Sequence, residues 1–222
     1  TVNQRVPPYH SESFPHNGIL AQIVEEAFAR SGYQVQFIFK PFARTLREGK
    51  VGSADGVLSL WYSDERAEYF LYSDPLPPNK IGFFARKGSQ ISYRNFSDLA
   101  PYQIGVVRGY DNPKGLELSG LNIEVSSNDA QNVAMLVAGR LDLALIDHHT
   151  GVYLLRKNHP YLISDFVWLE PTVEERLQYV GFSKQVEGHR VKLQAFNRGL
   201  SELRSSGRIE EIYSIHGYAW QK

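Results

Sequence analysis

The fold is decided by the run Leu58-Ser59-Leu60-Trp61-Tyr62-Ser63-Asp64-Glu65-Arg66. It joins a short apolar run, typical of a buried strand, to a polar turn that ends in an arginine. A second run, Gly139-Arg140-Leu141-Asp142-Leu143-Ala144-Leu145-Ile146-Asp147, has the same form and ends in an acid. A charge at a strand end is usually a solvated loop residue or a helix cap. Together, however, Arg66 and Asp147 would give one small molecule a cation and an anion, which would hold a zwitterion.

On either side of these runs, apolar strands alternate with segments of helical period. Apolar residues recur at helical spacing over 19–28 and stop at Ser31-Gly32, which predicts an amphipathic helix. Ser127 or Asn128 is placed to cap a later helix through 133–137. Further helices are predicted at 42–48, 96–99, 149–156, 190–205 and 209–213, and strands at 35–39, 56–60, 81–85, 103–107, 122–125, 141–146 and 177–182. This alternation predicts an α/β fold of mostly parallel sheets flanked by helices.

The rhythm of strands and helices restarts after Gly88, which suggests two lobes. The last helices follow a strand whose surroundings belong to the second lobe, so the chain is expected to cross between the lobes twice. We therefore predict one lobe from residues 1–86 with 183–222, and another from residues 87–182. Two crossings would form a hinge, and ligands of open α/β sheets commonly bind at the carboxyl ends of the strands. A ligand cleft is expected between the lobes.

Composition narrows the class of partner. Lysine plus arginine and aspartate plus glutamate each number 24, the net charge is zero, and no block of like charges occurs. Nucleic acid and anionic membranes are therefore not expected as partners. No apolar run approaches the roughly 18 residues of a membrane span, and the chain opens on Thr1-Val2-Asn3-Gln4 rather than on a basic start and an apolar core. Either the protein is cytosolic or a leader has been removed.

Several kinds of chemistry are not expected. Cysteine is absent from the sequence, which excludes disulfides, thiol nucleophiles and cysteine-based metal sites. His148 and His149 are adjacent, and adjacent residues at a helix start point apart, so no metal site is predicted. The glycines of 105–109 lack the spacing of a dinucleotide fingerprint, and no Gly-x-Ser-x-Gly elbow occurs. Neither a cofactor nor an enzymatic activity is predicted.

Five motifs, in order and spacing, carry a resemblance across essentially the whole chain. They are Gly18 with the helix that follows, Gly56-Val57-Leu58-Ser59, Ser63-Asp64-Glu65-Arg66 with Leu71-Tyr72-Ser73-Asp74-Pro75-Leu76, Gly105-Val106-Val107-Arg108-Gly109, and Leu136 to Asp147. The chain resembles the extracytoplasmic solute-binding proteins of family 3, the polar amino-acid receptors of ABC importers. The resemblance implies a two-lobed periplasmic-binding-protein-like fold, a periplasmic location with the signal peptide removed, and delivery of an amino-acid-like ligand to an ABC transporter permease. A monomer is expected.

The resemblance also implies roles for individual residues. Arg66 matches the arginine that clamps the ligand α-carboxylate, and a planar guanidinium suits that task because it gives a carboxylate two parallel bonds. Asp147 matches the acid that accepts the α-ammonium. Ser59 matches a strand-end position whose backbone carbonyl or hydroxyl contacts the ligand.

Other positions depart from the pattern of the family. Trp61 stands where many of these receptors carry a small hydroxyl residue, and it offers a stacking face instead. Tyr110 and Asp111 take the place of the usual hydroxyls of the second lobe, where an acid would repel a carboxylate. Tyr9, after two prolines, is predicted as an aromatic lid, and Phe42 as a residue that borders the cleft. The ligand is thus left open between an α-amino acid, an amino-acid derivative, an amine and an aromatic solute.

Three alternative functions stay open from the sequence. The same module serves as the extracellular sensor of membrane kinases and cyclases, in which case a tethered signalling module would be the partner. The fold has also been recruited for dehydratase chemistry on cyclic carboxylic acids, where Asp111 or Asp147 would supply a proton. The third alternative is a binding domain that acts through a protein partner.

Overall fold

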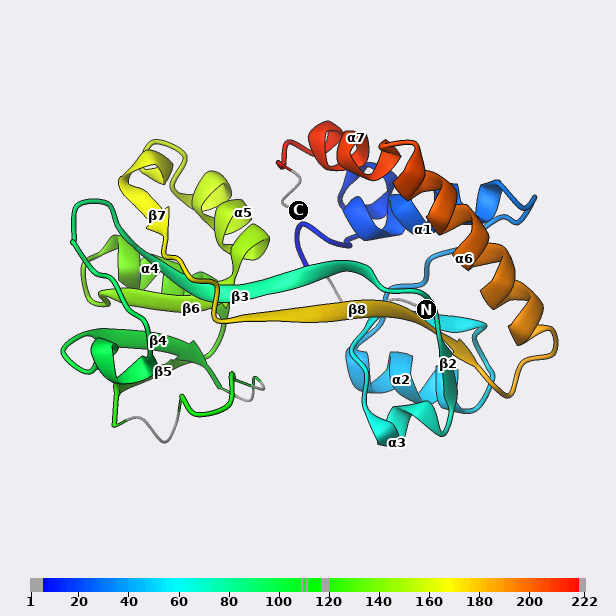
Figure 1. Ribbon diagram of the computed structural model, residues 1–222, viewed down its shortest axis with the longest axis horizontal. Helices are drawn as coiled ribbons and strands as arrows, with labels where there is room; N and C mark the ends of the chain where they lie inside the picture. The colour runs from blue at the N-terminus through cyan, green and yellow to red at the C-terminus, as the bar shows by residue number, and fades with distance from the viewer. Residues whose placement is uncertain (1–5, 109, 111, 117–119, 220–222) are drawn as a thin grey trace. The chain divides into compact units, whose positions relative to one another are not determined.

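A computed structural model describes residues 6–108, 110, 112–116 and 120–219. The chain divides into two compact units, which we call unit 1, residues 1–78 with 177–222, and unit 2, residues 79–176 (Figure 1). The chain passes between the units within β3 (Leu76–Arg86) and again within β8 (Glu174–Ser183). The crossings predicted after residues 86 and 182 lie later in the same two strands.

Unit 1 is a small antiparallel sheet covered by helices. Both β1 and β2 pair antiparallel with β8. Helix α1 packs along α6, and their facing side chains form the largest apolar core of this unit. Besides the start of β3 and most of β8, its elements are η1 (Pro15–Asn17), α1 (Ile19–Ala29), α2 (Phe42–Lys50), β1 (Gly56–Leu60), α3 (Asp64–Ala67), β2 (Phe70–Tyr72), α6 (His189–Ser205) and α7 (Arg208–Ile215).

The contact between α1 and α6 follows from the sequence of both helices. Helix α1 begins after Gly18, whose φ of 101° lies in a region that residues with a side chain rarely adopt. Its apolar residues at positions 19, 20, 23, 24 and 27 are all buried, as helical spacing predicts. Gly199 of α6 lies directly against it, since a Cβ at that position would be 2.0 Å from the Ala27 carbonyl oxygen. The absence of a side chain there lets the two backbones approach closely.

Unit 2 places the carboxyl ends of three strands at one edge of its sheet. Strand β4 pairs parallel with both β5 and β6, while β3 pairs antiparallel with β6 and β7. Helix α4 follows β5, and α5 follows β6 without an intervening loop, so both helices begin at this edge. The elements are η2 (Phe96–Leu99), β4 (Gln103–Val107), β5 (Asn122–Ser126), α4 (Asp129–Val137), β6 (Leu143–Asp147), α5 (His148–Asn158), η3 (Ile163–Asp165) and β7 (Phe166–Trp168), with the remainder of β3 and the start of β8.

The α/β class predicted from the sequence is confirmed, with mixed strand pairing in place of mostly parallel sheets. The predicted N-cap at Asn128 is confirmed, because its side chain accepts a hydrogen bond from the Gln131 N–H. The strand predicted at 35–39 is wrong. All five of these residues are described by the structure; Phe39 is assigned to a bridge, and residues 35–38 belong to no helix or strand. Its alternation of half-buried and exposed side chains reflects packing on the core, not membership of a sheet.

Candidate functional site

Arg66 lies in α3, in the turn that follows β1. Ser63 caps this helix, and its Oγ accepts a hydrogen bond from the Arg66 N–H at 3.3 Å. The Arg66 guanidinium lies over the Phe42 ring at 5.4 Å from the centroid, and its Nη1 donates to the Trp61 carbonyl at 2.9 Å. These contacts orient the side chain. The structure therefore brings together three residues that the sequence predicts for one site.

The Arg66 guanidinium forms no ion pair in the part of unit 1 that the structure describes, although its charge helps to lower the pKa of the neighbouring Glu65. Other cations nearby do form ion pairs: the Lys50 ammonium is 2.8 Å from Glu65, and the Arg44 guanidinium is 3.0 Å from Glu48. Arg66 is also partly buried. Because burying a charge without a directly bonded counter-charge is unfavourable, an anion bound beside this guanidinium would be stabilised.

Strand β1 is irregular where it approaches Arg66. Its register against β8 shifts between Val57 and Leu60. Ser59 lies in this irregular stretch with a φ of 61°, a left-handed conformation that is uncommon for residues with a Cβ. Its Oγ donates to Oε1 of Gln178 on β8. Backbone strain of this kind is frequent at ligand-binding positions.

Asp147 ends β6 and is the N-cap of α5. Its Oδ1 accepts from the Thr150 N–H at 2.9 Å, and its Oδ2 accepts from Nδ2 of Asn79 at 3.1 Å. The helix-cap interpretation of this acid is therefore correct. It does not exclude a second role, because a carboxylate can accept about four hydrogen bonds. The two bonds hold the carboxylate at the edge of the unit 2 sheet.

A second acid, Asp129, lies at the same edge of unit 2 and is absent from the predicted site. It is the first residue of α4, and its Oδ2 accepts a hydrogen bond from the Tyr110 hydroxyl at 2.8 Å. Its Oδ1 is buried and has no hydrogen-bond partner among the described residues. Burial raises the pKa of this carboxyl to about 6; the Tyr110 hydrogen bond opposes that shift, and the negative charge of Asp147 adds to it.

Tyr110 connects the predicted site to this second acid. Its surface is 57% exposed, but its hydroxyl is held against Asp129. Loss of hydration around the hydroxyl raises its pKa, and the charges of Asp129 and Asp147 raise it further. These three residues therefore form one electrostatically coupled group. The sequence did contain a signal for Asp129, since it directly follows the predicted cap Asn128 at the end of a strand.

The two histidines after Asp147 belong to the packing of unit 2. The His148 ring stacks on Phe84 at 5.7 Å and meets the edge of Trp168 at 4.9 Å. Burial and the neighbouring His149 lower the pKa of His148 to about 4, against the opposing influence of Asp147. Over the described ranges of the chain, no three histidine, aspartate or glutamate side chains are grouped as a metal ion would require.

One predicted site residue is corrected by the structure, and another lies outside it. The Tyr9 side chain is fully buried among the apolar side chains of α1, α6 and α7, so it has no ring surface with which to cover a ligand. We therefore assign Tyr9 to the core of unit 1. Asp111 lies outside the described residues.

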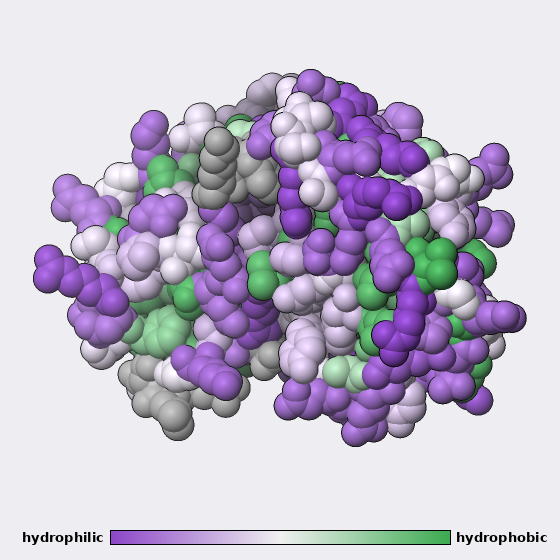
Figure 2. Space-filling model, turned by 45° about the vertical axis from the view of Figure 1, so that its right-hand side comes forward, coloured by the Kyte–Doolittle hydropathy of each residue, from purple (hydrophilic) through white to green (hydrophobic). Residues whose placement is uncertain are grey.

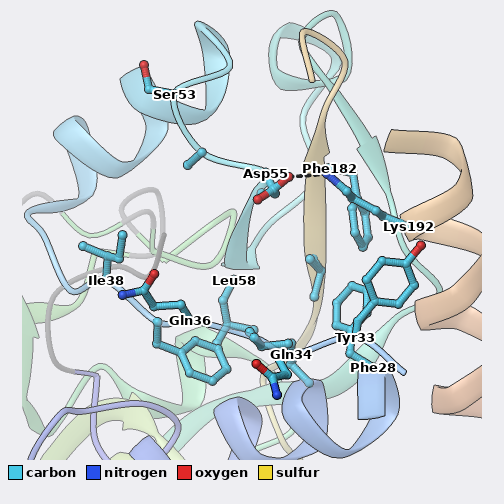
Figure 3. A pocket seen from close by; sticks show the side chains of 16 residues that line it. Phe28, Tyr33, Gln34, Gln36, Ile38, Ser53, Asp55, Leu58, Phe182 and Lys192 are labelled. Carbon is cyan, nitrogen blue, oxygen red and sulfur yellow. Dashed lines mark hydrogen bonds and ion pairs between the residues drawn. The ribbon is translucent and has the colours of Figure 1, made fainter. Parts of the chain in front are cut away.

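Unit 1 also contains a groove of about 320 Å³ (Figure 3). Its lining is mostly apolar and comes from α1, the extended segment 33–38, β1 and β8, with the ion pair of Asp55 and Lys192 at its rim. Figure 3 shows Gln34 and Gln36 along the extended segment and Phe28 at its side. None of the predicted site residues lines this groove, so it is distinct from the cluster around Arg66.

The molecular surface is dominated by polar side chains on the face drawn in Figure 2, where hydrophobic residues occur in small separate groups. Individual apolar side chains such as Val51 and Tyr161 are strongly exposed, but they belong to different units. Scattered exposure of this kind is ordinary for a protein surface. Of the helices that the structure describes, none has the length and apolar character needed to cross a membrane.

Residues 1–217 match the family model of the bacterial extracellular solute-binding proteins, family 3. The chain belongs to this family. The resemblance drawn from the sequence motifs is thereby confirmed, together with the class of protein that it implied. The members of this family are extracellular solute-binding proteins.

Individual relatives of this family 3 protein are distant. The L-cystine-binding protein TcyJ of Escherichia coli K12 is 22% identical over 158 residues, which cover 68% of this chain and 54% of that protein. The chain thus spans about half the length of this curated relative. Substrate-binding domain 2 of Lactococcus lactis GlnP, solved in an open conformation, has a TM-score of 0.77 at 17% identity, over 100% of this chain and 94% of that one.

A sensor domain also has a similar structure. A histidine kinase sensor domain with similarity to periplasmic binding proteins has a TM-score of 0.71 at 20% identity, over 100% of this chain and 96% of that one. At these identities the likenesses establish the fold of a two-lobed periplasmic binding protein. The ligand has to be argued from the site itself.

Proposed function

We propose that this family 3 protein binds a small solute that carries one carboxylate and at least one ammonium group. The observation that carries the proposal is the partly buried guanidinium of Arg66, which forms no ion pair among the described residues and contacts Trp61 just after the end of β1. Arg66 would bind the carboxylate through two parallel charge-assisted bonds. Asp147 would accept the ammonium, so that unit 1 and unit 2 hold opposite ends of the ligand.

Contacts from both units would make binding favour a closed state of the protein. A ligand shifts a conformational equilibrium only by its differential affinity for the two states. A ligand that bridges Arg66 and Asp147 gains its full set of bonds only when both residues reach it, so it stabilises closure. A Kd of about 1 μM, ordinary for such capture, corresponds to about 8 kcal/mol. Two charge-assisted contacts and an aromatic face at Trp61 are sufficient to supply this binding free energy.

The second acid of unit 2 favours a basic or diamino ligand. Asp129 and Asp147 are coupled electrostatically, so the unit 2 wall carries more negative charge than one α-ammonium neutralises. A second ammonium or a guanidinium on the ligand would relieve this repulsion. One similar protein was solved bound to arginine, which belongs to this class. Another binds L-cystine, in which a second carboxylate accompanies the second ammonium group. Basic and diamino acids are therefore the first candidates for this chain.

A thermal-shift panel tests the proposal. The panel contains L-arginine, L-lysine, L-cystine, L-glutamine and putrescine, and any compound that binds the native state raises the melting temperature. The compound with the largest shift is called the probe ligand below. We expect a basic or diamino acid to give that shift, and Arg66→Met to abolish it. Arg47→Met, at an exposed arginine of α2, is the matched control and should leave the shift unchanged. An undiminished shift in Arg66→Met would remove this residue from the site.

The protein that responds to closure is either a transport or a signalling partner. We propose an ABC transporter permease, the partner typical of the family. The likeness to a histidine kinase sensor domain favours a tethered signalling module as the second candidate. Sequencing the complete gene separates the two, because a membrane span followed by a kinase or cyclase domain on the same polypeptide would identify a sensor.

A further inference from the structure

Gln178 is a buried residue of unit 1 that lies beside a crossing between the units. It lies in β8 directly after the chain has crossed from unit 2, and its side chain is only 1% exposed. Both ends of its amide are engaged: Nε2 donates to the Pro77 carbonyl at 3.0 Å, and Oε1 accepts from the Ser59 hydroxyl. A buried amide with both functions paired is costly to disturb and therefore holds its neighbours in place.

The Pro77 carbonyl, which accepts the hydrogen bond from Gln178, lies next to the other crossing, in β3. Pro77 and Pro78 are consecutive residues of β3 and immediately precede the passage into unit 2. Proline has no N–H, so this part of β3 lacks two of the donors with which a strand is normally fixed to its neighbours. The Gln178 side chain provides a hydrogen bond to the backbone at this point. One amide therefore ties the outgoing crossing to the returning one.

The donor to Gln178 lies in the irregular end of β1. Ser59 has a left-handed backbone and sits where the register of β1 against β8 shifts. Its hydroxyl bond to Gln178 secures this strained conformation from the side. The strand end next to Arg66 and the two crossings therefore share a single side chain.

We infer that Gln178 is a positioning residue that couples the ligand-contacting end of β1 to both hinge crossings. During opening and closing, the crossings can then move only in ways that keep Ser59 in its left-handed conformation. Conversely, a ligand that displaces Ser59 also moves the hinge, because Gln178 links the two. The role of Gln178 in the hinge rests on the proposed function only where binding of a ligand is measured. Its main test requires no ligand.

The test measures the distance between the units without ligand. Because the chain has no cysteine, Ser201→Cys in α6 of unit 1 and Ala138→Cys at the end of α4 in unit 2 provide two unique sites for spin labels. Double electron–electron resonance then reports the distribution of distances between them. Gln178→Met keeps the length of the side chain and removes both hydrogen bonds. Gln185→Met, at an exposed glutamine beyond β8, is the matched control.

We expect Gln178→Met to broaden the distance distribution of the unliganded protein, and the control to leave it as in the parent. An unchanged distribution in Gln178→Met would overturn the inference. If that variant fails to fold, Ser59→Ala removes only one of the two bonds and should broaden the distribution in the same direction; no change there would equally overturn the inference. With the probe ligand, Gln178→Met should weaken binding about tenfold, since a smaller fraction of molecules is competent to close.

Failure of the inference is distinguishable from failure of the proposed function. If no compound of the panel shifts the melting temperature of the parent protein, the proposed ligand class is wrong. The unliganded distance distribution still decides whether Gln178 restrains the hinge. If the panel identifies a ligand and the distribution is unaffected by Gln178→Met, the binding function stands and the role of Gln178 is refuted.

Discussion

The acid at the start of α4 leads to a quantitative prediction about pH. With a pKa of about 6, Asp129 would be about nine-tenths ionised at pH 7 and about one-tenth ionised at pH 5. If the probe ligand presents a cation to this carboxylate, its affinity should fall about tenfold between these pH values, or about 1.4 kcal/mol. The ligand carboxylate does not titrate in this interval. Isothermal titration calorimetry at pH 7 and pH 5 measures the change directly.

The matched variant for this prediction is Asp129→Asn, which keeps the shape of the side chain and removes its charge. It should bind the probe ligand more weakly at pH 7 and show little further loss at pH 5. The unliganded protein should respond in the opposite sense: because the folded-state pKa is raised, stability contributed by protonation of Asp129 grows as the pH falls through about 6. A tenfold loss of affinity that persists in Asp129→Asn would show that another group is responsible, and would remove Asp129 from the ligand site.

Three predictions concern stability, each measured by urea denaturation. Gly199→Ala should lower the free energy of unfolding by about 1–3 kcal/mol, because its Cβ would overlap a backbone oxygen of α1, whereas Ser201→Ala on the exposed face of α6 should change little. His10 is fully buried, and burial lowers its pKa to about 4. The free energy of unfolding should therefore fall by about 3 kcal/mol on account of His10 as the pH falls from 6.5 to 4. His10→Leu should remove this part of the dependence of stability on pH. Arg208→Met should cost about 1 kcal/mol at pH 7 by breaking two bonds to Glu26 and one to Glu211, and the difference should vanish in acid, where the carboxylates are protonated; Arg208 lowers the pKa of Glu26. Equal slopes with and without His10, or no cost for Gly199→Ala and Arg208→Met, would contradict these assignments.

The sequence predicts well those helices whose apolar residues recur at the spacing that buries one face of the helix, and those whose caps are short polar residues. Helix α1 was found from its apolar spacing, and the cap of α4 from a short polar residue at the end of a strand. The segment 35–39 has the alternation of a strand and half-buried side chains at Val35 and Phe37, but a strand also requires a neighbour with which to pair. Periodicity reports burial, whereas pairing depends on which segments the fold brings alongside.

The site shows the same division between local and tertiary information. Arg66 and Trp61 lie together because they are close in sequence, around the end of β1 and the turn after it. Phe42 reaches the same place from the start of α2, through a contact that tertiary structure brings about. Asp129 was missed because its closeness to Asp147 arises only when β5 and β6 flank β4 in the sheet. The position after the cap Asn128 marks Asp129 as the start of a helix, but no spacing along the chain reports its closeness to Asp147.

Tyr9 failed as a predicted lid for a related reason. Its position after two prolines suggested a loop at the rim of a cleft. The side chain is instead buried in the core that α1, α6 and α7 build together. Two of those helices lie at the far end of the sequence, so the local motif could not indicate what would cover the ring.

The central claim, that Arg66 and Asp147 hold opposite ends of one ligand, is tested most directly by calorimetry with a pair of compounds. The probe ligand is compared with the amine that remains when its carboxylate is removed. We expect Arg66→Met to weaken the probe ligand by about a hundredfold or more, as loss of a bidentate charge-assisted contact should, and to leave the affinity for the amine unchanged. Asp147→Asn should weaken both compounds. Equal losses for the two compounds in Arg66→Met, or full affinity for both in Asp147→Asn, would contradict the account.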